Sequence, residues 1–318
     1  MWFKNITLFE FINEIEFNAV SLSDMLQCFR FKDCGLSQAS SIGWVSPVSD
    51  KKDTDIFIHD ANGFCMIALK HQEKVIPSSI LKEMLDDKVE ELEARENRKV
   101  RKKEKDSLKE DIYHSLLPRA FIKTNITYAY IDFKDKLLVI NTASSKKAEK
   151  LTVELRKAIG SLKIRLPDLM PIPQLLTTWI KENKYPSDLV VEDNCVLQDK
   201  NEAAGVIRCQ KQNLLSDDIV TLIDTGREVI QLGLSWLDHV RFIINEDFVL
   251  KSIKFLEVIQ DQVNDTFVDT AEQKFDTDFV IMTETIRELL AYLRSVFSKK
   301  TSVPEKIKEP TPDMLSES

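Results

Sequence analysis

The sequence predicts an α+β protein in which mixed sheets and hairpins are combined with long amphipathic helices. An Asn-Gly pair lies between two apolar runs near residue 62, and from Pro77 onward apolar residues recur at helical spacing. Of the 318 residues, 43% are hydrophobic and 30% are charged, which is typical of a soluble globular protein. At roughly 100–200 residues per domain, this length corresponds to about two domains.

An N-terminal α/β unit is expected over residues 1–76. Its expected elements are a strand within 2–15, a short helix that begins at Ser21, a strand at 43–45, and two further strands at 56–58 and 64–69. Asn62 and Gly63 join the last two strands, and Asn-Gly between apolar runs is the strongest short-range signal of a β-hairpin. Both residue types tolerate the positive φ angles that a tight hairpin turn requires.

A projecting basic helical segment is expected over residues 77–120. The apolar residues of its first helix lie on one face, at spacings of three and four: Ile80, Leu81, Met84, Leu85, Val89 and Leu92. A second helix is expected to begin at Ser107, because Ser107 and Glu110 have the spacing of a capping box. Pro118 is expected to end this helix.

Residues 121–166 are expected to form a unit of one hairpin and one helix. Its elements are expected as strands at 121–131 and 137–142 and a helix at 145–159 with Gly160 as the C-terminal cap. Three prolines between residues 167 and 173 then indicate a boundary between units.

A C-terminal α+β unit is expected over residues 167–297. Its expected elements are a helix at 174–183, a strand at 205–212, a capped helix at 216–225, a hairpin of 229–236 with 240–245, and a long amphipathic helix at 278–297. Residues 298–318 are rich in Lys, Pro, Ser and Glu without periodicity, so we expect a disordered tail.

Motifs that carry nucleotide chemistry or catalysis are missing from the sequence. With 7 glycines, the chain contains neither G-x-G-x-x-G nor G-x-x-x-x-G-K-[ST]. The four histidines lack metal-ligand spacing, and no G-x-S-x-G serine elbow is present. We therefore expect no enzyme activity, no metal and no cofactor, although an active site assembled from residues distant in sequence stays open.

Cysteine usage and hydropathy predict a cytoplasmic protein. The five cysteines include no C-x-x-C pair, so we expect neither a disulfide framework nor a zinc site, but small buried apolar residues in a reducing compartment. The N-terminus lacks the features of a signal peptide. No run of 18 apolar residues is available to span a membrane.

Charge is distributed unevenly along the chain. The net charge of −8 and the pI of about 5.3, taken for the whole chain, argue against a nucleic-acid binder. Residues 95–165, however, contain 19 Lys and Arg against 9 Asp and Glu, a net charge of +10, so the remainder carries −18. The candidate phosphate-binding residues of this segment are Arg101, Lys102, Lys103, Lys105, Lys109, Arg119, Lys123, Lys146 and Lys147. Each Lys or Arg placed against a phosphate releases condensed counterions, so this segment favours a polyanion as partner.

A smaller basic group lies in the C-terminal unit. Arg208, Lys211 and Gln212 leave a predicted strand beside a capped helix. Arg and Lys bind phosphates, and Gln can hydrogen-bond sugar or phosphate oxygens. An ordinary polar turn has the same composition, so both interpretations stay open. Phe121 likewise fits either a core residue or an exposed anchor.

Two long motifs in the basic segment resemble those of a known family. Residues 104–109 (EKDSLK) and 114–121 (HSLLPRAF) look like the signature of the RdgC family, the bacterial recombination-associated proteins. Shorter pieces resemble the family in the same order, among them residues 2–5 (WFKN), 43–45 (GWV) and 206–209 (VIRC). The resemblance covers the chain up to about Phe297.

The resemblance implies a function as well as a fold. It implies a ring-shaped homodimer with a positively charged hole around double-stranded DNA, which it binds without sequence preference and without catalysis. It further implies a nucleoid-associated protein that restrains RecA-promoted recombination. By the same resemblance, Lys211 and Gln212 contact DNA, and Phe121 belongs to a dimer contact that gates the ring.

Two other functions stay open. The basic helix could dock an acidic protein partner, including RecA itself, without a primary role in DNA binding. A nuclease or another DNA enzyme is the second alternative.

Overall fold

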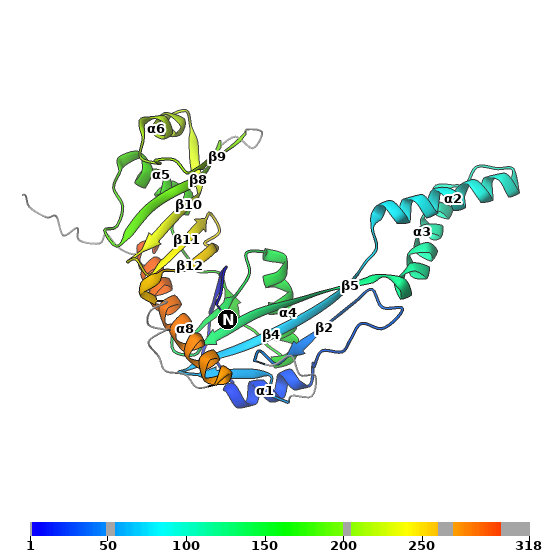
Figure 1. Ribbon diagram of the computed structural model, residues 1–318, viewed down its shortest axis with the longest axis horizontal. Coiled ribbons are helices and arrows are strands. Elements are labelled where there is room, and N and C mark those ends of the chain that lie inside the picture. The colour runs from blue at the N-terminus through cyan, green and yellow to red at the C-terminus, as the bar shows by residue number, and fades with distance from the viewer. Residues whose placement is uncertain (1, 49–54, 200–204, 260–269, 300–318) are drawn as a thin grey trace, which may run out of the picture.

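Two antiparallel sheets and a projecting pair of helices form the part of the chain that the structure describes, residues 2–48, 55–199, 205–259 and 270–299. In this computed structural model the parts are arranged as an open crescent (Figure 1). A five-stranded sheet stands at one end, the helical arm stands at the other, and a seven-stranded sheet lies between them. The predicted α+β class is confirmed.

The seven-stranded sheet has the order β2-β4-β5-β6-β1-β7, with β3 paired to β4. Its strands are β1 (Thr7–Phe11), β2 (Ser40–Val45), β3 (Ile58–Ala61), β4 (Phe64–Val75), β5 (Phe121–Asp132), β6 (Leu137–Ile140) and β7 (Ile164–Arg165). Asn62 and Gly63 have φ angles of 51° and 77°, so the predicted Asn-Gly hairpin between β3 and β4 is confirmed. The predicted hairpin of β5 with β6 is also confirmed.

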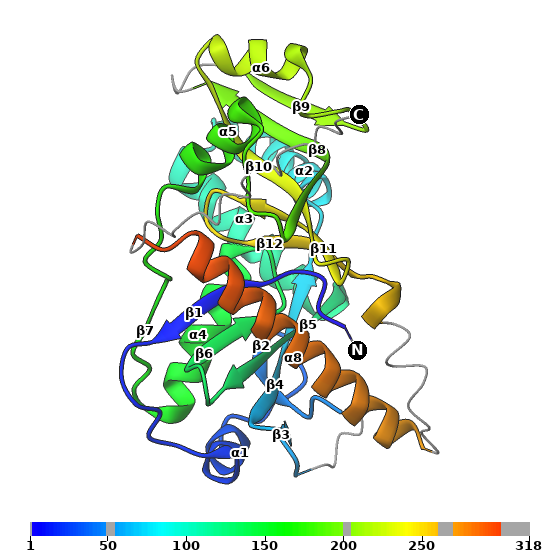
Figure 2. The ribbon, with the colours of Figure 1, turned by 90° about the vertical axis from the view of Figure 1, so that its left-hand side faces the viewer.

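Helices cover both faces of this sheet. On one face α1 (Ala19–Gln27) and α4 (Ser145–Ile159) pack over apolar residues such as Ile67 and Ile131. On the other face α8 (Ala271–Val296) packs over Phe64 and Tyr130, and Figure 2 shows α8 running across the sheet. The helix α4 has the predicted bounds, and its Gly160 cap has a φ of 78° that a side chain would strain.

The five-stranded sheet has the order β12-β11-β10-β8-β9. Its strands are β8 (Leu189–Asp199), β9 (Val206–Gln210), β10 (Arg227–Trp236), β11 (Val240–Asn245) and β12 (Leu250–Phe255), with α5 (Ile172–Glu182) and α6 (Asp217–Asp224) packed against β10. Two backbone hydrogen bonds between Ile6 and Leu250 join it to the N-terminal segment. A single hydrophobic core runs from this sheet through α8 into the seven-stranded sheet.

The arm grows out of the long β4–β5 ladder. The two strands pair along their whole length, from Phe64 opposite Asp132 to Val75 opposite Phe121. They lead into α2 (Ser78–Glu96), α3 (Lys102–Leu116) and the short 3-10 helix η1 (Leu117–Arg119). Figure 1 shows this helix pair standing away from the body. Helix α3 ends at Leu116, two residues before Pro118, which lies in η1, so the predicted end of this helix is confirmed.

Several predicted helix starts are wrong, because residues outside the apolar pattern cap these helices. Helix α3 begins five residues before Ser107, since the Glu104 carboxylate accepts the backbone N–H of Arg101 at 2.9 Å. Helix α1 begins before Ser21, since Asn18 and Ser21 form a capping box. Helix α8 begins seven residues before Asp278, where a Thr270–Gln273 capping box precedes a polar first turn.

The C-terminal unit holds more strands than the sequence pattern predicts. The strands β8 and β12 were not predicted, whereas the β10–β11 hairpin and the helices α5 and α6 lie within two residues of their predicted bounds. Ser216 stands at the start of α6, but its side chain makes no capping hydrogen bond. Of the predicted tail, Ser298 forms a β-bridge with Leu169, and 300–318 lie outside the described residues.

A buried ion pair fixes α8 to the seven-stranded sheet. Arg287 of α8 donates to both carboxylate oxygens of Asp132, at 2.7 Å from Nε and 2.9 Å from Nη2. The side chains are 12% and 2% exposed, and the guanidinium also lies 3.9 Å from the centre of the Phe64 ring. Asp132 also accepts the backbone N–H groups of Lys134 and Asp135, so one carboxylate organises the β5–β6 turn and the helix contact.

Asp132→Asn is expected to lower the free energy of unfolding by up to about 3–5 kcal/mol, because it leaves the buried Arg287 charge with only the partly exposed Glu284 carboxylate, 3.1 Å away. Urea unfolding followed by circular dichroism measures the change. Asp168→Asn, which breaks the exposed ion pair with Lys299, is the matched control and should cost no more than about 1 kcal/mol. Equal midpoints for the two variants would contradict the role assigned to Asp132.

Candidate nucleic-acid interface

The predicted nucleic-acid-binding residues fall into three groups, and all twelve are exposed. The arm carries Arg101, Lys102, Lys103, Lys105, Lys109 and Arg119. The face of the seven-stranded sheet beside α4 carries Lys123, Lys146 and Lys147. The end of the edge strand β9 carries Arg208, Lys211 and Gln212.

Within the described residues, ion pairs divide the charged residues of the arm into a paired set near the tip and an unpaired set on α3. Near the tip, Arg98 holds Glu104 with two hydrogen bonds of 2.9 and 2.7 Å, and Lys99 pairs with Glu93 at 2.9 Å. The hydrogen bonds from Arg98 and then from the Arg101 backbone lower the pKa of Glu104 to about 2. These acids therefore neutralise the tip.

The lysines of α3 are arranged differently. Lys102, Lys105 and Lys109 recur at spacings of three and four, so they share one face of the helix. Neither they nor Lys103 forms an ion pair within the residues that the structure describes. Their charges are therefore available to a partner.

The second group lines a pocket of about 190 Å³ between the sheet and the start of α4. It brings Lys123 of β5 together with Lys146, Lys147 and Lys150 of α4. Glu73 lies 3.6 Å from Lys123 and is the acid of the lining. His71, Asn125 and Thr127 complete the polar part of the wall.

The third group borders a wider hollow of about 570 Å³ on the five-stranded sheet. Arg208 and Lys211 both line it, and Lys211 has a φ of 53° where the chain leaves β9. The Gln212 backbone N–H donates to the Asp193 carbonyl at 3.2 Å, which anchors the turn. The structure thus brings Arg208 and Lys211 to one hollow.

Cysteine burial follows the prediction only in part. Cys65, Cys195 and Cys209 are buried and free, and burial raises the pKa of the Cys195 thiol to about 12. Cys28 is exposed and Cys34 is partly exposed, so the prediction of buried cysteines is wrong for these two. Both stand beyond the strand pairings, in the connection between α1 and β2.

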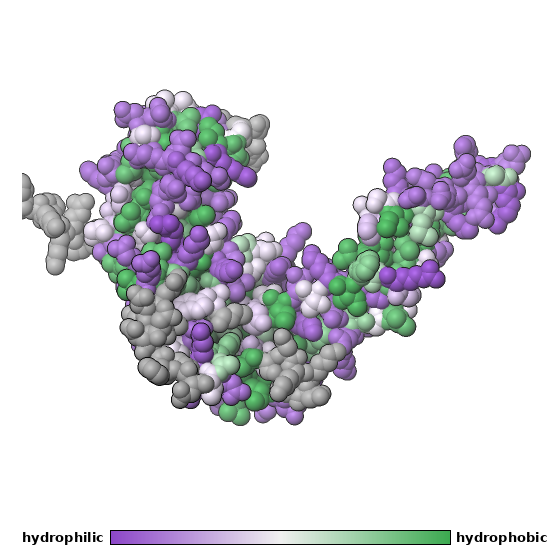
Figure 3. All heavy atoms as spheres, viewed as in Figure 1, coloured by the Kyte–Doolittle hydropathy of each residue, from purple (hydrophilic) through white to green (hydrophobic). Residues whose placement is uncertain are grey.

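Phe121 is exposed rather than buried. It is 86% exposed at the start of β5, opposite Val75 in the ladder. Ile122 is also exposed here, as are Ile80 and Met84 on the neighbouring α2. Figure 3 shows apolar surface over the base of the arm and hydrophilic surface at its tip. We call Val75, Ile80, Met84, Phe121 and Ile122 the arm-base patch.

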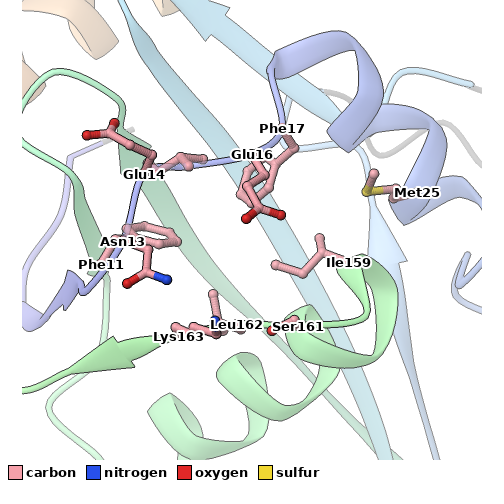
Figure 4. A pocket seen from close by; sticks show the side chains of 11 residues that line it. Phe11, Asn13, Glu14, Glu16, Phe17, Met25, Ile159, Ser161, Leu162 and Lys163 are labelled. Atoms are coloured by element: carbon pink, nitrogen blue, oxygen red, sulfur yellow. The ribbon is translucent and has the colours of Figure 1, made fainter.

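Another pocket lies away from all of these residues. It has a volume of about 250 Å³ and lies between the β1–α1 connection and the end of α4 (Figure 4). Its lining includes Glu14, Glu16, Phe17 and Ile159, and it contains none of the predicted site residues. The charged residues of its lining are Glu14, Glu16 and Lys163, a net charge of −1, which does not favour a phosphate.

The part of the chain that the structure describes offers neither a metal-binding cluster nor a membrane-spanning helix. No group of three or more His, Cys, Asp or Glu side chains in it could hold a metal ion. None of its helices is long and apolar enough to cross a membrane.

Sequence reasoning missed several residues of the wall of the pocket at α4, among them His71 and Asn125. The alternation of side chains along β4 could have indicated His71, because this residue continues the face of Ile67 and Leu69. The register that places Asn125 opposite His71 is a tertiary fact that the pattern does not contain.

Comparison with known proteins identifies the family. Residues 1–300 match the family model described as "Putative exonuclease, RdgC". The chain belongs to the RdgC family. The resemblance predicted from residues 104–109 and 114–121 is thereby confirmed.

Relatives of this chain carry a different description from the family model. A protein of Psychromonas ingrahamii is 38% identical over 306 residues, which cover 95% of this chain and 100% of the relative. Relatives from Serratia proteamaculans and Yersinia pestis are each 37% identical, over 91% and 92% of this chain and 95% and 96% of their own. All three are named "Recombination-associated protein RdgC". The family description names an exonuclease, and the names of these relatives place them in recombination.

Glu104→Gln is expected to speed hydrogen exchange at the Arg101 amide several-fold, because the neutral amide oxygen of Gln accepts this N–H more weakly than the carboxylate does, and the charge that pairs with Arg98 is lost. The wild-type amide should stay protected as the pH falls through the ordinary glutamate range, since protection is lost only toward the lowered pKa of about 2. Glu110→Gln, on the same helix, is the control. An unchanged exchange rate at Arg101 would show that Glu104 does not cap α3.

Proposed function

We propose that this chain is a sequence-independent double-stranded DNA-binding protein that acts as a ring-shaped homodimer and restrains RecA-promoted recombination. The observation that carries the proposal is the set of exposed lysines on α3 that form no ion pair among the described residues. The names of its relatives supply the recombination context.

The chemistry of these lysines favours backbone contacts. A lysine ammonium is a compact point charge, whereas bases are read by bidentate side chains in the grooves. Phosphate contacts contribute affinity that does not depend on sequence. A protein that presents mainly lysines to the duplex is therefore expected to bind unrelated sequences alike.

The arm-base patch supports self-association. Its exposed apolar side chains come from the end of the β4–β5 ladder and the first turns of α2, with Phe121, opposite Val75, the most exposed. An isologous contact buries such a patch against its own copy. Because the crescent is open on one side, two copies joined both at their arms and at their opposite ends would enclose a space, and this supports the ring.

Occupation of DNA explains the effect on recombination. A protein that surrounds the duplex in the nucleoid would compete with RecA for the same DNA without touching RecA. No catalysis is needed for this effect, so the proposal assigns no catalytic residue, metal or cofactor.

The adaptor alternative has one observation in its favour, because a basic helix beside an apolar patch also suits an acidic protein partner. The nuclease alternative is favoured by the family description, which names an exonuclease. Both alternatives are separated from the proposal by the experiments below.

Replacing Lys102, Lys105 and Lys109 together by Gln is expected to weaken duplex binding and make its salt slope less steep by about 0.9 for each phosphate contact removed. Fluorescence anisotropy at several salt concentrations measures both quantities. Lys88→Gln is the single-charge control, because Lys88 already pairs with Glu91 on α2. Wild-type affinity that does not change with salt would refute the electrostatic mechanism.

The same variants separate the alternatives. Loss of RecA inhibition with unchanged DNA binding would establish the adaptor. Labelled DNA incubated with the wild-type protein and a divalent metal should stay intact, and turnover that one acidic substitution abolishes would establish the nuclease.

Phe121→Ser is expected to weaken self-association and the inhibition of recombination together, because it removes the largest side chain of the arm-base patch. Sedimentation velocity over a range of protein concentrations measures the first effect. Val20→Ser, at an exposed apolar position on α1, is the control and should leave the mass unchanged. A dimer of unchanged strength in the Phe121 variant would contradict the contact.

A further inference from the structure

The face of the seven-stranded sheet that α4 covers changes from apolar to polar along β4. Cys65, Ile67 and Leu69 are buried on this face, and the next two residues of the same face are His71 and Glu73. On β5 the residues opposite Leu69, His71 and Glu73 are Thr127, Asn125 and Lys123. The core of this layer therefore ends in a row of polar side chains.

The first turns of α4 close this row into a pocket. Lys146, Lys147 and Lys150 line it together with the polar residues of β4 and β5. Four lysines against Glu73 leave a net charge of +3 while His71 is neutral. Because residues of the first two turns of α4 line the pocket, the positive end of the helix dipole adds to this charge.

We propose that this pocket binds one phosphate group of the nucleic-acid backbone, with Lys146, Lys147 and Lys150 as its cationic ligands and His71 as a donor. The inference rests on the proposed function, because the bound duplex supplies the phosphate. Its volume of about 190 Å³ suits one phosphate rather than a base with its sugar. Asn125 and Thr127 add neutral donors to the same wall.

His71 makes this site sensitive to pH. Burial lowers the pKa of His71, Lys150 lowers it further, and Glu73 opposes them. The charged groups around it are Glu73 from β4, Lys123 from β5 and the three lysines of α4, and the lining residue from β2 is the uncharged Ile42. The free protein therefore holds His71 neutral near neutral pH.

A bound phosphate reverses this balance. Its negative charge favours the imidazolium form, so the pKa of His71 rises in the complex and binding takes up a proton. A group whose pKa is higher in the complex strengthens binding as the pH falls. Duplex affinity should therefore increase from about pH 8 to about pH 6, where backbone phosphates do not titrate.

Two measurements test the proposal. The first follows the His71 ring by NMR across pH, alone, with a short duplex, and with inorganic phosphate. The second compares duplex affinities of Lys150→Gln and of Lys157→Gln, a control that removes the same charge from the other end of α4. We expect duplex to raise the His71 pKa, and Lys150→Gln to bind about five- to tenfold more weakly.

A third variant isolates the histidine. His71→Gln should bind duplex like the wild type at about pH 8 but lose the increase in affinity at about pH 6. The control His239→Gln, on the distant β10–β11 turn, should keep that increase. The pocket would be overturned if the wild type binds duplex while the His71 pKa does not move and Lys150→Gln binds as tightly as the wild type. The proposed function would then still stand. A shift with inorganic phosphate and not with duplex would overturn the assignment to nucleic acid. Failure of the wild type to bind any duplex would overturn both.

Discussion

The buried pair of Arg287 and Asp132 is the interaction on which the arrangement of the crescent depends. It joins the C-terminal helix α8 to the turn between β5 and β6, so it fixes the two sheets relative to each other. The Ile6–Leu250 hydrogen bonds and the continuous core around α8 also hold the two sheets together. A charged pair at this point is costly to break, because either partner alone would remain desolvated.

This fixed frame separates the basic groups in space. The β4–β5 ladder belongs to the sheet at one end and carries the arm at the other, so the lysines of α3 stand far from the hollow beside β9. The net charge of −8 is thus compatible with a polyanion partner, because residues 95–165 carry +10 while the remainder of the chain carries −18. The net charge does not show how the charges of the arm are paired. Acidic residues of the arm pair with Arg98 and Lys99, whereas the lysines of α3 form no ion pair among the described residues.

Sequence reasoning succeeded where local chemistry decides the structure. The Asn62-Gly63 hairpin, the Gly160 cap and the end of α3 at Pro118 each follow from the backbone preferences of one or two residues. It failed at α3 and α8, whose first turns are polar and are fixed by the caps at Glu104 and Thr270.

The candidate site was predictable in composition but not in geometry. Basic residues can be counted from the sequence, whereas the pairing of Arg98 with Glu104 and the register of His71 with Asn125 depend on tertiary structure. Phe121 shows the same limit, because its spacing fits a core or a surface position and only the ladder decides between them.

The most direct measurement compares the release of the protein from closed circular and linear duplex of the same sequence after a jump to high salt. High salt removes the phosphate contacts, so only enclosure of the DNA can then retain the protein. We expect the protein to stay on the circle and to leave the linear molecule through its ends. Equal rates of release from both forms would contradict a ring that surrounds DNA.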